Sequence, residues 1–224
     1  MTQSHSQPWQ AFWQLLIAAP EPLAVARTAV AVLDDEFDFL AEPAAPAPIQ
    51  STAAAFVPRP ERAAELDAFV AQNPDLPREA SAMGSGLRDE AQLDRVDAAG
   101  ALWLCRLILT MPAVALPENG PLVRLLQRAA SSPDRDLVCA AADASAHLDA
   151  RASQLALVAR LHADPHSLGH AGIDRVLACL KQIADGRCVR EMEALLVERG
   201  AELSDVHAWQ ARHIVQVIRR AGRK

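Results

Sequence analysis

The sequence predicts an all-α protein, and three observations lead to that prediction. Of the 224 residues, 51% are hydrophobic and the formal net charge is only −6, so the chain can bury a sizeable core. Alanine, leucine and arginine, all strong helix formers, dominate the composition. Residues typical of strands are scarce, since tyrosine is absent and aromatic residues make up 4% of the chain.

Acidic residues and prolines distinguish the N-terminal part of the chain. Residues 1–120 contain 7 lysines and arginines against 16 aspartates and glutamates, whereas residues 121–224 contain 15 against 12. Apolar residues at helical spacing predict an N-terminal helical segment over residues 1–42. Five prolines then predict a linker or long loop over residues 43–60, because a proline removes a backbone donor and clashes with the preceding helical turn.

We expect a helical domain over residues 61–224. Its first helix fits residues 61–72, and a long helix fits residues 89–109, with Asp89 as the N-cap. Pro121 follows an Asn-Gly turn and can occupy the first position of the next helix.

A helix–turn–helix pattern recurs from residue 122 onward. Apolar positions of the first copy have counterparts 32 residues later, and those of the second copy have counterparts after a further 38 residues. Proline and capping residues mark the three turns, which are Ser132-Pro133-Asp134, Asp164-Pro165-His166 and Glu202-Leu203-Ser204. Periods of this length are typical of α-solenoids, in which stacked helix pairs bury each other's apolar faces. An irregular helical bundle is the alternative interpretation.

On these turns and apolar columns, the segment from Leu122 to Arg220 resembles the HEAT-like repeat superfamily. The resemblance implies helical hairpins stacked as a short HEAT-like solenoid in the C-terminal half, preceded by the helical N-terminal part. It also implies a surface that binds another macromolecule. Some HEAT-like proteins bind DNA on a basic concave face, so the resemblance permits nucleic acid as well as protein.

The sequence contains no recognisable catalytic motif: the nucleophile elbow, the H-E-x-x-H motif, the P-loop and the dinucleotide-binding glycine pattern are all missing. The densest set of possible zinc ligands is His162, Asp164, His166 and His170. However, Pro165 and Gly169 interrupt the helical face that an H-x3-H pair needs. We therefore expect a non-enzymatic protein without a metal or cofactor, and a metal-dependent enzyme centred on the His162–His170 turn is one alternative.

Four cysteines lie among apolar neighbours without a C-x-x-C pair: Cys105, Cys139, Cys179 and Cys188. This pattern favours buried free thiols in the reducing cytoplasm. The alternative is a reactive thiol at Cys188, which follows Gly186 near a predicted helix start. We expect no membrane span, because Arg106 and Pro112 interrupt the longest apolar run, residues 99–116.

The sequence thus predicts an interaction module whose partner is another protein. It could be an immunity or antitoxin protein that blocks a toxin, or an adaptor in a secretion or regulatory assembly, and the alanine and arginine bias indicates a bacterial source. Because helical stacks often bind through their second helices, we expect the contacts at polar positions of those helices: Arg135, Asp143, Asp174, Arg175, Lys181, Arg212 and Arg219. The acidic stretch from Asp34 to Leu40 is the next candidate surface. Nucleic acid on a basic C-terminal face is the less favoured alternative, because the charges of the predicted set are mixed.

Overall fold

The structure is a computed structural model that describes Ala11, Leu93 and residues 60–75, 96–110 and 120–222. Within these residues it contains eight α-helices, two short 3-10 helices and no β-strand, which confirms the all-α prediction. No helix in this part of the chain is long and apolar enough to cross a membrane. The predicted N-terminal segment and linker, and with them the Asp34–Leu40 stretch, lie outside the described residues, apart from Ala11 and Pro60.

Two helices, α3 (Pro60–Gln72) and α6 (Ala98–Ile108), form the N-terminal end of the described fold and contact each other. The predicted helix over 89–109 is wrong at its start, because Val96 and Asp97 are not helical. The Asp97 carboxylate accepts a hydrogen bond of 2.8 Å from the Gly100 amide, so Asp97 caps the helix in place of Asp89.

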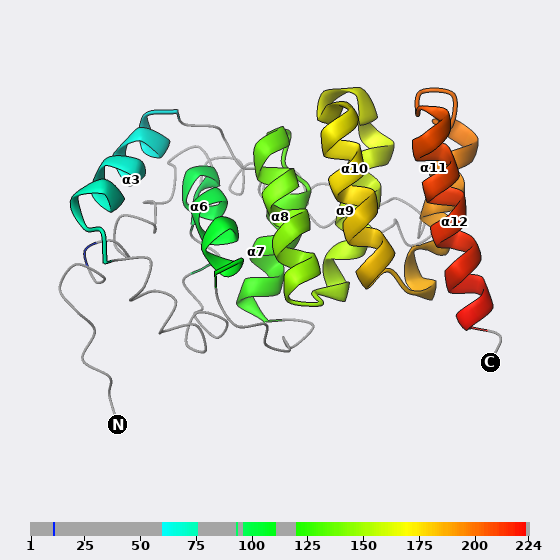
Figure 1. Cartoon of the computed structure of the whole chain (residues 1–224), viewed down its shortest axis with the longest axis horizontal. Helices are drawn as coiled ribbons and strands as arrows, with labels where there is room; N and C mark the ends of the chain where they lie inside the picture. The colour runs from blue at the N-terminus through cyan, green and yellow to red at the C-terminus, as the bar shows by residue number, and fades with distance from the viewer. Residues whose placement is uncertain (1–10, 12–59, 76–92, 94–95, 111–119, 223–224) are drawn as a thin grey trace, which may run out of the picture.

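Three helix pairs follow: α7 (Pro121–Ala130) with α8 (Arg135–His147), α9 (Gln154–Ala163) with α10 (Pro165–Ile183), and α11 (Val189–Glu198) with α12 (Asp205–Ala221). The two helices of each pair contact each other. Successive pairs pack side by side along the long axis of the molecule (Figure 1). One layer contains α7, α9 and α11, and the other contains α6, α8, α10 and α12.

Side-chain caps start the second helix of each pair. Asp134, Asp164 and Ser204 each accept a hydrogen bond from a backbone amide in the first turn of α8, α10 and α12, respectively. The cap predicted at Ser204 is thereby confirmed, as is Pro121 at the first position of α7. Inside α10, Gly169 has φ 63° and kinks the helix, a backbone conformation that glycine adopts without steric cost.

A buried arginine connects two of the inter-helix turns. Arg160, on α9, is 8% exposed, and its Nε donates a hydrogen bond of 2.9 Å to the carbonyl of Ser132 in the α7–α8 turn. Its other nitrogens donate to the carbonyl of Asp164 and the hydroxyl of Ser167, at the α9–α10 turn. Since these acceptors replace water around the guanidinium, Arg160 holds the two turns in a fixed relation.

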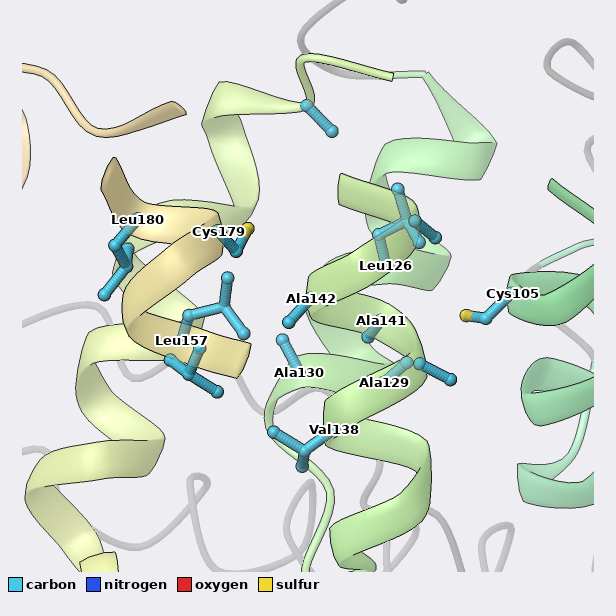
Figure 2. Close-up of a cluster of buried hydrophobic side chains, with 14 of the residues drawn as sticks. Cys105, Leu126, Ala129, Ala130, Val138, Ala141, Ala142, Leu157, Cys179 and Leu180 are labelled. Atoms are coloured by element: carbon cyan, nitrogen blue, oxygen red, sulfur yellow. The ribbon is translucent and has the colours of Figure 1, made fainter. Parts of the chain in front are cut away.

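Helix α8 lies at the centre of the stack and contacts α6, α7 and α10. Figure 2 shows Ala141 and Ala142 of α8 among larger side chains of neighbouring helices, including Leu126 of α7 and Leu157 of α9. Gly172 brings α10 close to α8: a Cβ there would lie 3.5 Å from the sulfur of Cys139. Small side chains at this contact therefore set the spacing of the two helices.

The five side chains predicted to line the seam between pairs are all at most 2% exposed: Leu157, Val158, Val176, Leu177 and Leu180. We expect Leu157→Ala to lower the free energy of unfolding by about 2–5 kcal/mol, because it leaves a cavity in this seam. Urea denaturation checks the value. Leu155→Ala is the matched control on the same helix, since Leu155 is 42% exposed, and equal losses in both variants would contradict the assigned core.

Candidate partner-binding groove

An open groove of about 450 Å³ crosses α6, α8 and α10, on the layer that contains the second helices. Each of the three helices contributes to its walls. The lining residues are Arg106, Leu109, Arg135, Asp136, Cys139, Ala140, Asp143, Ala171 and Arg175. We call this feature the α6–α8–α10 groove.

Three arginines dominate the charge of the groove. Nη1 of Arg175 lies 3.2 Å from a carboxylate oxygen of Asp143, so this pair bridges α10 and α8. Arg106 and Arg135 are exposed and form no ion pair with any other described residue. Their guanidinium groups are consequently available to a carboxylate from outside, which arginine can bind through two parallel hydrogen bonds.

Small and apolar side chains form the rest of the lining. Cys139 is 6% exposed and Ala140 is 8% exposed, while Leu109 at the edge exposes 43% of its surface. Burial raises the pKa of the Cys139 thiol, although the charges of Arg175 and Arg135 act in the opposite direction. The groove thus offers an apolar surface beside unpaired cations, a combination that suits a peptide segment with both apolar and acidic side chains.

The structure brings together three of the seven predicted contact residues, since Arg135, Asp143 and Arg175 all line the groove. The other four lie outside it. Asp174 accepts a hydrogen bond from the buried His207 at 3.1 Å and so connects α10 to α12, and Arg219 pairs with Glu193 of α11. Lys181 and Arg212 are exposed on α10 and α12.

Two lining residues on α6 were missed by the sequence prediction, because the repeat was recognised only from residue 122. Arg106 carried a usable signal: an arginine within the apolar run 99–116 has to face solvent or a partner, since an unpaired buried charge is costly. Leu109 gave no such signal, because a leucine at the end of an apolar helix normally packs inside.

The histidines of the 162–170 segment point to separate partners. Nε2 of His162 lies 2.8 Å from a carboxylate oxygen of Glu198, and Nε2 of His166 lies 3.7 Å from one of Glu202. The ring of His170 stands 5.3 Å from that of His207. Among the described residues no group of three or more histidine, cysteine or acidic side chains is placed to hold a metal ion.

The four cysteines are free and buried, as predicted. Burial raises the pKa of Cys105 and Cys179 to about 12 and that of Cys188 to about 11. The alternative of a reactive thiol at Cys188 is therefore wrong, because burial opposes the thiolate that a nucleophile needs.

Comparison with known proteins found no matching family model, no similar curated protein and no similar solved structure. Any function has to be argued from the groove and its neighbouring surfaces. The most specific of these features are the unpaired arginines and the exposed leucine.

Thiol labelling tests the position of Cys139. In the native protein near pH 8 we expect a disulfide reagent to modify Cys139 first, since this cysteine lines an open groove. Cys105, Cys179 and Cys188 should react only on unfolding, because their thiols are buried and have raised pKa values. Mass spectrometry of the labelled peptides identifies the order, and rapid native labelling of Cys188 would show that the assigned burial is incorrect.

Proposed function

We propose that this protein is a non-enzymatic interaction module that binds an acidic segment of another protein in the α6–α8–α10 groove. The observation that carries the proposal is the position of Arg106 and Arg135, unpaired among the described residues, beside a floor of small side chains. Arginine is enriched at the energetic centres of protein interfaces. An apolar side chain of the partner would contact Leu109, and its carboxylates would pair with the two arginines.

We further propose that the helix pairs form a short α-solenoid of the HEAT-like kind. Support comes from buried positions of α8, α10 and α12 that recur every 35 residues: Leu137, Gly172 and His207; Val138, Ile173 and Ala208; Ala141, Val176 and Ala211; Ala144, Cys179 and Ile214; and Ser145, Leu180 and Val215. This step lies between the 32 and 38 residues expected from the sequence. It differs from each by three residues, close to one helical turn.

A solenoid also accounts for the position of the groove. Stacked repeats present a continuous surface built from equivalent helices, and such surfaces are where these proteins bind their partners. An immunity protein that masks a toxin and an adaptor in a secretion or regulatory assembly would both use a groove of this kind. The acidic segment is the chemical requirement that the two cases share.

A protein partner fits the groove better than nucleic acid does. A phosphate backbone favours an unbroken positive surface, whereas Asp136 and Asp143 lie among the arginines of the groove. On the basic C-terminal helix, Arg219 is paired with Glu193. The histidine segment supports an enzyme even less, because His162 and His166 pair with different glutamates.

Charge reversal tests the proposal directly. A tagged copy of the full chain is used to isolate partners from cells of the source organism, and the affinity of each partner is then measured with purified proteins. We expect the double variant Arg106→Glu, Arg135→Glu to bind at least about tenfold more weakly, because two interfacial charge pairs become repulsive. Circular dichroism verifies that the helical content is unchanged.

Two variants outside the groove serve as matched controls. Arg212→Glu changes an exposed arginine of α12, and Arg190→Glu changes one of α11 in the other layer. Both should bind as the unaltered protein does. Unchanged affinity in the groove variant, or an equal loss in either control, would reject the α6–α8–α10 groove as the binding site.

A further inference from the structure

An apolar stripe runs along the outer face of α12. Six large hydrophobic side chains are exposed among the described residues, and three of them lie on this helix: Val206 at 62%, Trp209 at 61% and Val217 at 49%. At 100° per residue, these three lie opposite the face that α12 buries, which includes Ala211 and Val215. Large apolar side chains that gather on one exposed face indicate a contact surface.

The tryptophan of this stripe is held in a defined position. Its ring stacks on that of His213, one turn further along the helix, with ring centroids 5.4 Å apart and planes 9° from parallel. A flat aromatic surface of this kind is well suited to an interface, because little side-chain freedom is lost when it is covered.

The neighbouring Arg212 argues against a further helix pair stacked on α12. In α8 and α10 the positions 70 and 35 residues earlier are Ala142 and Leu177, which are buried at 0% and 2% exposure. An arginine at this position would be costly to bury in an apolar seam. The stack therefore ends at α12, and head-to-tail continuation by another copy is equally disfavoured.

We propose that the outer face of α12 is a homodimer interface, on which α12 of a second copy packs antiparallel with His213 at the two-fold axis. This register places Trp209 of each copy opposite Val217 of the other. It also places Val206 opposite Arg220, so that the aliphatic part of the arginine covers the valine. Both apolar contacts occur twice, as an isologous interface requires.

Charge complementarity identifies a second copy as the occupant. Asp205 lies in the first turn of α12 and Arg220 in the last turn. In the antiparallel register these two residues of different copies lie next to each other at both ends of the interface, and the helix dipoles also oppose each other. An interface made by one helix of 17 residues is small, so the dimer should form with rising concentration and not be obligatory.

Sedimentation equilibrium of the full chain measures the association. We expect the mass to rise with concentration from 24.1 kDa towards twice that value. Trp209→Ala should raise the dissociation constant at least about tenfold, as loss of an interfacial aromatic anchor does. Val197→Ala on α11, where the valine is 86% exposed, is the matched control and should leave the dissociation constant unchanged.

Two further arms test the register. Asp205→Arg and Arg220→Asp should each weaken the dimer, and the double variant should restore it. Under mild oxidation, His213→Cys should give a disulfide-linked dimer, whereas Ala221→Cys, about 24 Å from its counterpart in this register, should not. A monomer at every concentration overturns the proposal, and so does a dimer that Trp209→Ala and Val197→Ala affect equally. A monomer in which Trp209 is shielded from quenchers would show that the chain's own N-terminal residues cover the stripe, which also excludes the second copy.

Discussion

Close packing around α8 is the constraint on which the rest of the structure depends. This helix contacts α6, α7 and α10, and its alanines at positions 140, 141, 142 and 144 are at most 8% exposed. Side chains of this size let three neighbouring helices approach, and the larger side chains of those helices then fill the space between them (Figure 2). Gly172 extends the same principle to the contact between α8 and α10.

The groove follows from this packing. Where α6, α8 and α10 meet at the surface, small residues such as Ala140 and Ala171 leave a hollow, and Arg106, Arg135 and Arg175 project around it. Arg160 holds the α7–α8 turn to the α9–α10 turn from the other layer, so the helices that carry these arginines have a fixed relation. A rigid scaffold that carries unpaired charges loses little conformational entropy when a partner binds.

Much of the fold could be predicted from the sequence, whereas the site could be predicted only in part. Helix content, the Ser204 cap and the buried cysteines follow from local composition and spacing. The repeat step was ambiguous by three residues, because a shift of nearly one turn leaves the same helical face buried. The start of α6 was misplaced because Asp89 and Asp97 are equally good caps in isolation. Asp143 and Arg175 were expected in the contact set, but the groove requires α6, which no local pattern connects to α8.

Hydrogen–deuterium exchange of the protein bound to its isolated partner tests the central claim most directly, because it reports protection helix by helix in the intact complex. The account predicts that slowed exchange is concentrated in α6, α8 and the Ala171–Arg175 part of α10, where the groove lies. Protection concentrated in α7, α9 and α11, with the groove helices unchanged, would contradict it.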